Sequence, residues 1–318
     1  MKSKMSISIV IPCFNEEQNI LVLHEKLSAA LQMLQSQRSL EYEVLFINDG
    51  STDRTLERLD ECRALDNHCK IIDFRRNYGQ TAAMAAGFDH ATGDVIIPMD
   101  ADLQNDPADI QSLLDKIDEG FDVVSGWRKN RKDKAISRRL PSVIANWMIS
   151  KISRVPLNDY GCTLKAYKRE ILQHVKLYGE MHRFIPIYAS WLGARITEIP
   201  VSHHPRIYGK SKYGIMRTFK VLLDLVTIKF LGDYSTKPIY LFGGIGISFG
   251  LLGFLCELQV AYVKFAKGGK AYDNPMLIIG IFFMVIGFQS ILIGLLAEIN
   301  IRTYHESQHR PIYWIKKT

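Results

Sequence analysis

The chain has 318 residues, with 40 Lys and Arg against 33 Asp and Glu, and 47% of its residues are hydrophobic. This composition excludes a disordered protein, and the length predicts one large domain or two smaller ones. Residues 239–256 and 276–297 contain no charged residue, and each stretch is long enough to cross a bilayer. A purely soluble protein is therefore excluded, and the longer, more polar remainder excludes a mainly membrane-embedded one.

The cysteines indicate a reducing compartment. Five cysteines are an odd number, and they form no Cys-x-x-Cys pair. This argues against a disulfide framework and against a zinc site. The first six residues lead into no long apolar run, so we expect no signal peptide.

Over the first 200 residues, short β-branched runs alternate with helical patterns. The expected strands are 7–11, 42–47, 70–74, 94–98 and 121–125. The expected helices are 18–34, 81–91 and 136–153, and the first has a capping-box-like start at Asn15. The alternation predicts an α/β domain with a buried, mostly parallel sheet.

Unusual polar residues follow four of these strands, at the carboxyl ends where such sheets bind ligands. They are Pro12 to Glu17, Asn48 to Ser51, Arg75 to Asn77 and Asp100 to Asp102. No expected strand is followed by G-x-G-x-x-G, which excludes a dinucleotide-binding site of that type. The P-loop motif is also absent from the sequence, which excludes a P-loop nucleotide site.

Asp100-Ala101-Asp102 is typical of a cation site that holds a diphosphate. Two close carboxylates bind a hard cation such as Mg²⁺ or Mn²⁺, whose remaining positions accept phosphate oxygens. Gln104 offers a further neutral oxygen. On these residues alone, a solvated loop that caps the helix after Pro107 remains the alternative.

In this order, the motifs resemble the family 2, GT-A type glycosyltransferases, and within them the polyprenyl-phosphate glycosyltransferases. The resemblance covers nearly the whole chain. Within this group, the chain is similar to the bactoprenol glucosyltransferases and the undecaprenyl-phosphate aminoarabinose transferase. The motifs that carry it are Ile9-Val10-Ile11-Pro12-Cys13-Phe14-Asn15-Glu16-Glu17, Asn48-Asp49-Gly50-Ser51, Arg76-Asn77-Tyr78-Gly79-Gln80, Met99-Asp100-Ala101-Asp102-Leu103-Gln104, Asp159-Tyr160-Gly161-Cys162 and Arg206-Ile207-Tyr208-Gly209-Lys210-Ser211-Lys212-Tyr213. One departure is Asn48, where many relatives carry Asp.

The resemblance implies a Rossmann-like mixed sheet, then an amphipathic interface helix and two transmembrane helices. The implied parts are a catalytic domain at 1–212, an interface segment at 213–236, two transmembrane helices at 237–300 and a cytoplasmic tail at 301–318. It also implies a divalent metal cofactor, Mg²⁺ or Mn²⁺, with Asp100, Asp102 and Gln104 as its ligands.

The resemblance further implies a UDP-sugar donor, with Asp49 accepting the N3 hydrogen of uracil. The implied donor-binding residues are Pro12, Asn15, Glu17, Asp49, Asn77, Asp100 and Asp102. Without the resemblance, Asp49-Gly50 is simply a turn.

Basic side chains gather around Gly209 in the segment 202–213. Arginine offers paired donors and lysine a point charge, both of which suit a phosphate. The expected acceptor and phosphate ligands are Arg128, Arg131, Arg206, Lys210 and Lys212. The alternative is a basic patch that attracts anionic lipid. His203 and His204 lack metal-ligand spacing, so we expect structural roles for them.

Asp159 stands at the family's acceptor-side motif, after the helical pattern at 136–153. The resemblance implies that Asp159, Asp102 and Arg206 are the catalytic residues, with Asp159 acting as a base or a positioning group. A helix cap or turn beside Gly161 is the alternative.

Residues 215–231 alternate polar and apolar positions with helical spacing, which predicts an amphipathic helix of about 25 Å in the membrane interface. A core helix is the alternative.

Gly280, Gly287 and Gly294 repeat every seven residues, and Gly246-x-x-x-Gly250 marks the first span, which favours close helix packing and oligomer contacts. The basic flanks favour an inner or plasma membrane protein with the catalytic domain and both termini in the cytoplasm.

The expected function is inverting transfer of a sugar, with glucose from UDP-glucose as the first candidate, to undecaprenyl or another polyprenyl phosphate. Another sugar, such as 4-deoxy-4-formamido-arabinose, mannose or an N-acetylhexosamine, is the alternative, because a few hydroxyl contacts decide specificity. A processive synthase would carry Gln-x-x-Arg-Trp, but the chain has no Arg-Trp. A nonenzymatic scaffold would need neither Asp100-Ala101-Asp102 nor Asn48-Asp49-Gly50. The expected partners are the bilayer and further copies of the chain, a tetramer being favoured by the resemblance, and no nucleic acid.

Overall fold

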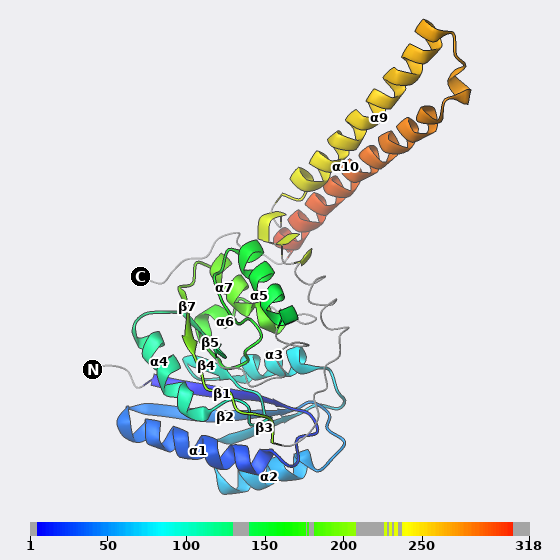
Figure 1. The fold of residues 1–318 in the computed structure, drawn as a ribbon. Coiled ribbons are helices and arrows are strands. Elements are labelled where there is room, and N and C mark those ends of the chain that lie inside the picture. Colours follow the sequence, from blue (N-terminus) through cyan, green and yellow to red (C-terminus); the bar gives the residue numbers. More distant parts are fainter. Residues whose placement is uncertain are drawn as a thin grey trace. The chain divides into compact units, whose positions relative to one another are not determined.

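The computed structural model describes residues 5–129, 140–175, 177, 181–207, 226–227, 229–230, 232–234 and 237–307 (Figure 1). Contacts divide the chain into two units, Met1–Val226 and Thr227–Thr318. Arg131, Lys210, Lys212 and most of the expected amphipathic helix at 215–231 lie outside the described residues.

A seven-stranded mixed sheet, in the order β3-β2-β1-β4-β6-β5-β7, forms the centre of the first unit. Its strands are β1 (Met5–Cys13), β2 (Leu40–Asn48), β3 (Cys69–Asp73), β4 (Val95–Pro98), β5 (Val123–Trp127), β6 (Lys165–Lys168) and β7 (Ile196–Pro200). The β3-β2-β1-β4 part is parallel, whereas β6 is antiparallel to both β4 and β5. This sheet confirms the predicted α/β fold of the GT-A type.

The expected strands agree with β1 to β5 within two residues at each end. The β-branched residues of β1, β2, β4 and β5 are buried on both faces of the sheet, as Ile9, Val10 and Ile11 of β1 show with no exposed surface. In β3, at the edge of the sheet, Ile71 and Ile72 are half-buried. The strands β6 and β7 were not predicted. Although β6 runs against its neighbours, four of the six strand pairings are parallel, which confirms the prediction of a mostly parallel, mixed sheet.

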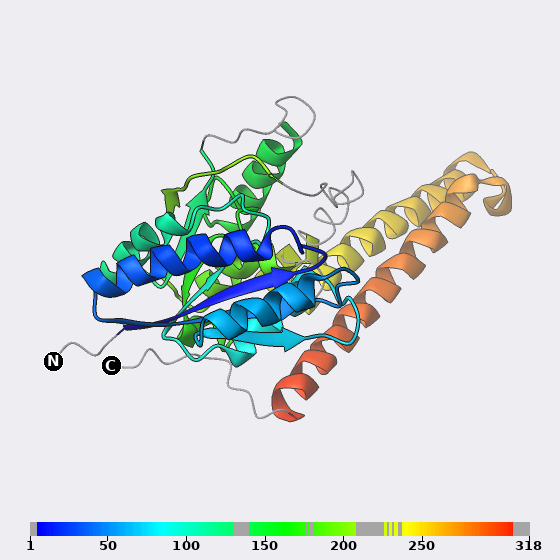
Figure 2. The same ribbon diagram turned by 90° about the horizontal axis from the view of Figure 1, so that it is seen from below.

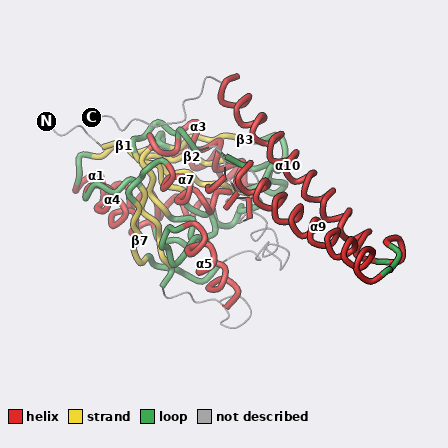
Figure 3. The backbone as a smooth tube through the Cα atoms, turned by 90° about the horizontal axis from the view of Figure 1, so that it is seen from above, coloured by secondary structure: helices red, strands yellow, loops and turns green. Residues whose placement is uncertain are grey.

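Helices cover both faces of this sheet (Figure 3). They are α1 (Ile20–Gln37), α2 (Thr55–Leu65), α3 (Gln80–His90), α4 (Ile110–Asp118), α5 (Leu140–Ser153), α6 (Arg169–Leu172) and α7 (Ile185–Trp191). Apolar residues of α1, α2 and α4 join one core cluster, and those of α3, α6 and α7 join another on the opposite face. Figure 2 shows α1 and α2 side by side along the sheet.

The predicted capping box at Asn15 is wrong. Helix α1 begins at Ile20, and its N-cap residue Asn19 makes no side-chain capping bond. Asn15 instead has a φ of 53°, and its backbone N–H donates to Ser51 Oγ at 3.0 Å. A contact to the loop after β2 has replaced the local cap.

The second unit is a hairpin of two helices, α9 (Ile239–Lys267) and α10 (Pro275–Ser307), which lie side by side in Figure 1. Both are long and apolar enough to span a membrane. A Cβ on Gly246 would lie 2.6 Å from the Gly287 carbonyl oxygen, and one on Gly253 would lie 2.7 Å from that of Gly280. These four glycines therefore allow close packing of α9 against α10, whereas a Cβ on Gly250 would meet no atom within 4 Å.

Candidate active site

The loops after β1 and β2 hold each other through side-chain to backbone hydrogen bonds. Asn15 Oδ1 accepts from Thr52 N at 2.8 Å, and Glu17 Oε2 accepts from Arg54 N at 3.0 Å. Asn15 adopts its positive φ in the left-handed region, which Asn tolerates better than most residues. The predicted donor residues Asn15 and Glu17, with Pro12 at the end of β1, thus lie at the carboxyl edge of the sheet.

Asp49 joins the end of β2 to the loop before α3. Its Oδ1 accepts from Tyr78 N at 2.7 Å, and its Oδ2 accepts from Gly79 N at 2.9 Å and from Asn77 Nδ2 at 3.0 Å. Burial raises the pKa of Asp49, while the two backbone donors act in the opposite direction. The structure therefore brings the predicted donor residues Asp49 and Asn77 into direct contact.

Gly50 permits this approach. It has a φ of 64°, and a Cβ at this position would lie 2.3 Å from the carbonyl carbon of Arg76. The turn and the contact between the two loops are thus one feature, and only glycine satisfies both requirements.

A cavity of about 510 Å³ lies among the loops that follow β1, β2 and β3. Phe14, Asn48, Arg75 and Asn77 are among its lining residues. Asn48 Nδ2 donates to Asp73 Oδ1 at 2.7 Å, a bond that an aspartate at position 48 would lack. The partner Asp73 therefore explains the departure at Asn48, since two carboxylates would repel each other there.

Asp100 and Asp102 follow β4 and face different partners. Asp100 Oδ1 accepts from Gln80 Nε2 at 2.9 Å, and Asp100 Oδ2 accepts from Thr163 Oγ1 at 2.8 Å. Asp102 is buried, and its Oδ2 accepts from Arg206 Nη2 at 2.6 Å. The predicted catalytic residues Asp102 and Arg206 are therefore an ion pair.

These carboxylates suit a divalent cation. Burial and the neighbouring Asp100 raise the pKa of Asp102 to about 7, although Arg206 lowers it in part. A buried Asp102 beside the half-buried Asp100, with too little positive charge around the two carboxylates, is the donor set that Mg²⁺ or Mn²⁺ satisfies. The Gln104 backbone N–H donates to Asp102 Oδ1 at 3.2 Å, whereas its side-chain Nε2 donates to the His204 carbonyl oxygen at 3.4 Å.

At the predicted acceptor motif, Asp159 is buried and binds Arg128 with both oxygens. Arg128 Nε donates to Asp159 Oδ2 at 2.7 Å, and Arg128 Nη2 donates to Asp159 Oδ1 at 2.9 Å. Burial lowers the pKa of Arg128, but pairing with Asp159 outweighs it and raises the pKa above its usual value. The turn beside Gly161 is also present, because Gly161 N donates to Asp159 Oδ1 at 3.1 Å.

Three residues that the sequence analysis missed connect these parts. Thr163 and Gln80 fix the two oxygens of Asp100, and Glu198 contacts the backbone of Asp159. Thr163 directly follows the Asp159 motif and Gln80 ends the Arg76 motif, so their places in the sequence could have indicated them as site residues. Glu198 lies in the unpredicted strand β7 and carried none.

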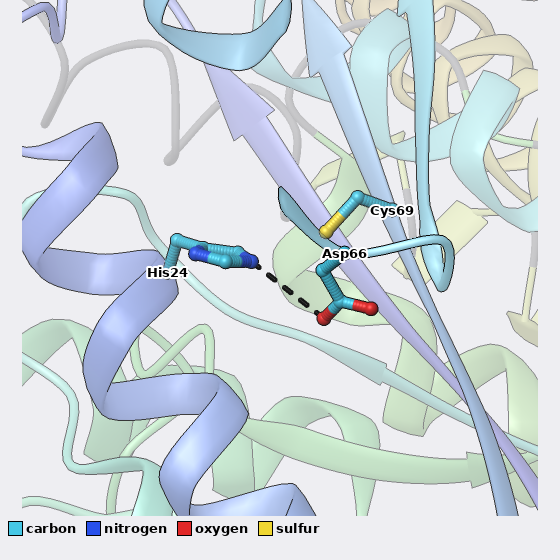
Figure 4. A group of neighbouring side chains, drawn as sticks. All are labelled: His24, Asp66 and Cys69. Carbon is cyan, nitrogen blue, oxygen red and sulfur yellow. Dashed lines mark ion pairs between the residues drawn. The ribbon is translucent and has the colours of Figure 1, made fainter. Parts of the chain in front are cut away.

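A second group of metal-ligating side chains, His24, Asp66 and Cys69, lies away from these loops (Figure 4). His24 Nε2 is 3.6 Å from Asp66 Oδ2, and Cys69 is the first residue of β3, opposite the carboxyl edge. Asp66 Oδ1 also accepts from His68 N at 2.9 Å. The group ties α1 to the connection between α2 and β3.

Comparison with known proteins identifies the family. Residues 8–176, more than half of the chain, match the model of glycosyl transferase family 2. The chain belongs to glycosyl transferase family 2. This membership confirms the resemblance and makes the protein a glycosyltransferase rather than a nonenzymatic scaffold.

Two relatives match over almost the full length of this glycosyltransferase. It is 41% identical to dodecaprenyl-phosphate galacturonate synthase of Rhizobium johnstonii, over 98% of this chain and 93% of the relative. It is 39% identical to undecaprenyl-phosphate 4-deoxy-4-formamido-L-arabinose transferase of Klebsiella pneumoniae, with the same two coverages. Its fold is similar to that of glucosyl-3-phosphoglycerate synthase from Mycobacterium tuberculosis, solved with Mn²⁺, UDP and phosphoglyceric acid, with a TM-score of 0.58 at 17% identity over 74% of this chain and 82% of the other.

Proposed function

We propose that this family 2 enzyme transfers a sugar from a UDP-sugar to a polyprenyl phosphate, with inversion at the anomeric carbon. The observation that carries the proposal is the 2.8 Å hydrogen bond from Thr163 to Asp100. It joins the predicted metal and donor motif to the predicted acceptor motif, as one reaction between two substrates requires. The names of the two full-length relatives support polyprenyl phosphate as the acceptor.

The donor nucleotide is proposed to bind at the loops after β1, β2 and β3. Asp49 Oδ2 already accepts from Gly79 N and from Asn77 Nδ2, whereas Oδ1 accepts from Tyr78 N and has a second lone pair with which it can accept the N3 hydrogen of uracil. Pro12, Asn15, Glu17 and Asn77 are proposed to line the nucleotide.

Asp100 and Asp102, with Gln104 at the edge, are proposed to hold a Mg²⁺ or Mn²⁺ ion. When bound, the ion compensates the negative charge that develops on the departing diphosphate. Arg206 is proposed to donate hydrogen bonds to the same charge, since arginine binds phosphate through paired donors. Gln80 and Thr163 orient Asp100.

The acceptor phosphate attacks the anomeric carbon from the side opposite the departing UDP. A phosphate monoester has a second pKa of about 6, so at neutral pH it is already a nucleophile. Both oxygens of Asp159 already accept from the Arg128 guanidinium. We therefore propose that Asp159 orients Arg128 toward the acceptor phosphate and does not act as a base, with Arg131, Lys210 and Lys212 as further phosphate ligands.

For the sugar, glucose is one candidate. The names of the two relatives make galacturonate and 4-deoxy-4-formamido-L-arabinose candidates of equal standing. Mannose and N-acetylhexosamine complete the set.

The membrane arrangement is part of the proposal. We propose that α9 and α10 span the inner or plasma membrane and that residues 213–236 lie in its interface. The catalytic domain of residues 1–212 and the tail of residues 301–318 then lie in the cytoplasm. Copies are proposed to associate as a tetramer through outward faces of the hairpin, where a Cβ on Gly244 or Gly250 would meet no atom within 4 Å.

The proposal is tested by incubating membranes that contain the protein with undecaprenyl phosphate and a panel of radiolabelled UDP-sugars. We expect one of them to label the lipid, and we expect a chelator of divalent cations to abolish the labelling. UDP-sugar binding without transfer to any polyprenyl phosphate would contradict the proposed acceptor.

A further inference from the structure

A carboxylate on strand β7 holds the loop that carries Asp159. Glu198 Oε1 accepts from Asp159 N at 3.0 Å and from Asn158 N at 3.0 Å. Glu198 Oε2 accepts from Asn158 N at 3.0 Å and from Asn158 Nδ2 at 2.7 Å. Two consecutive backbone N–H groups and one amide side chain thus converge on a single carboxylate.

The register of the sheet brings this carboxylate to the acceptor side. β7 is parallel to β5, with Ser125 beside Glu198, and Val201 N donates to Trp127 O at 3.0 Å. Arg128 directly follows the end of β5. Glu198, Arg128 and Asp159 therefore meet although they come from three separate segments of the chain.

The backbone position of Asp159 decides whether it binds Arg128 with both oxygens. A bidentate carboxylate and guanidinium pair requires the two groups to lie close to one plane. Glu198 fixes the peptide groups on both sides of the Asn158 Cα, and so limits rotation of the following residue. A hydrogen bond from a neutral donor to a charged acceptor is stronger than one between neutral groups, which makes a carboxylate well suited to this task.

We propose that Glu198 is a positioning residue for the acceptor half of the reaction, acting through Asp159 on Arg128. The inference deepens the proposed function and rests on it. No substrate contact is assigned to Glu198 itself.

A double-mutant cycle between Glu198→Ala and Asp159→Asn tests the proposal in the full-length protein. We expect Glu198→Ala to lower turnover on the order of 10- to 100-fold, as small misplacements of reacting groups do, with unchanged affinity for UDP. In the Asp159→Asn background, Glu198→Ala should lower turnover no further, because its route of action is already lost. Losses that multiply, or near-normal turnover of Glu198→Ala, would overturn the proposal.

Two variants and a second readout separate positioning from general damage. Thr197→Ala alters the adjacent β7 residue, whose side chain points to the other sheet face, and should leave turnover unchanged. Glu198→Gln keeps the size of the side chain but turns a donor toward the Asn158 N–H, so we expect it to lower turnover. This variant keeps the proposal testable if Glu198→Ala does not fold.

Hydrogen exchange tests the positioning independently of activity. The amides of Asn158 and Asp159 should exchange faster in Glu198→Ala and Glu198→Gln than in the wild type or Thr197→Ala. Unchanged exchange would overturn the positioning role, whereas a wild type that transfers no sugar to lipid phosphate would overturn the proposed function and leave the exchange result standing.

Discussion

Arg206 Nη2 lies 2.6 Å from Asp102 Oδ2, so a residue proposed to bind phosphate already neutralises a residue proposed to bind the metal ion. The guanidinium therefore competes with a cation for the same carboxylate oxygen. Binding of the cation to this oxygen and release of Arg206 toward a phosphate would then be linked steps.

Replacing Arg206 by Ala tests this competition. Turnover should fall by the loss of one or more charge-assisted hydrogen bonds, each worth about 1.5 to 3 kcal/mol. In the absence of lipid, Mn²⁺ should bind more tightly, because the competing Arg206 guanidinium is gone. Electron paramagnetic resonance measures this binding. If bilayer association is lost while turnover on a detergent-soluble, short-chain acceptor is unchanged, Arg206 belongs instead to a lipid-binding patch.

The pKa of Asp102 predicts how metal binding depends on pH. Burial and Asp100 raise this pKa to about 7, so the carboxylate holds a proton in more acidic solution and must release it to bind a cation. Mn²⁺ affinity should be constant above about pH 7 and fall toward tenfold per pH unit below it. Calorimetry across this range measures the effect. An affinity that does not vary with pH would contradict Asp102 as a ligand.

Asp102→Asn should nearly abolish turnover while the fold is kept, since a neutral amide does not balance the charge of a divalent cation.

The pKa of Asp102 is higher in the folded protein than in the unfolded chain, so ionisation of this carboxyl opposes folding. The opposing effect grows between about pH 4 and pH 7. The metal-free variant should therefore melt at a higher temperature than the wild type at pH 8 and at a similar temperature at pH 4. A lower melting temperature at pH 8, or normal turnover, would contradict the assignment.

Asp159→Asn should lower turnover by about 100-fold, the scale expected when a reacting group is misplaced, with little change in UDP affinity. The loss should be the same at all pH values, because Asp159 is proposed to orient Arg128 and not to accept a proton. Turnover at saturating lipid and donor, measured at several pH values, tests this. A loss that shrinks as pH rises would identify Asp159 as a base.

Asn48→Asp tests the role of Asp73 at the proposed nucleotide site. The variant should destabilise the protein by about 1 to 3 kcal/mol, the cost of a buried polar group that loses its hydrogen bond, because it places a carboxylate at the buried position 48 beside Asp73. Thermal unfolding measures the loss. Adding Asp73→Asn should restore the stability, and a loss that persists in the double variant would point to another cause.

Strands β1, β2, β4 and β5 could be predicted because they are apolar runs buried on both faces, such as Ile9 to Ile11, whereas β3 could be predicted from its half-buried β-branched pair Ile71 and Ile72. The polar residues after these strands meet at one edge because parallel strands end together. Strand β6 was missed because its four residues, Lys165 to Lys168, include a lysine at each end and show no apolar run.

The pairs within the site were beyond prediction from one sequence. Arg206 and Asp102 are 104 residues apart, and Thr163 and Asp100 are 63 apart. The three-dimensional arrangement of the loops brings them together, and neither residue of a pair carries a local pattern that names its partner. The same holds for Glu198, whose task depends on the register between β5 and β7.

The anomeric configuration of the lipid product tests whether this enzyme transfers a sugar to a polyprenyl phosphate with inversion. Purified protein is incubated with undecaprenyl phosphate, Mn²⁺ and the UDP-sugar that labels the lipid, and the product is examined by nuclear magnetic resonance. We expect a sugar joined to the lipid phosphate through its anomeric carbon, in the configuration opposite to that of the donor, and no product from Asp102→Asn. A product that retains the donor configuration, or an equal yield from Asp102→Asn, would contradict this expectation.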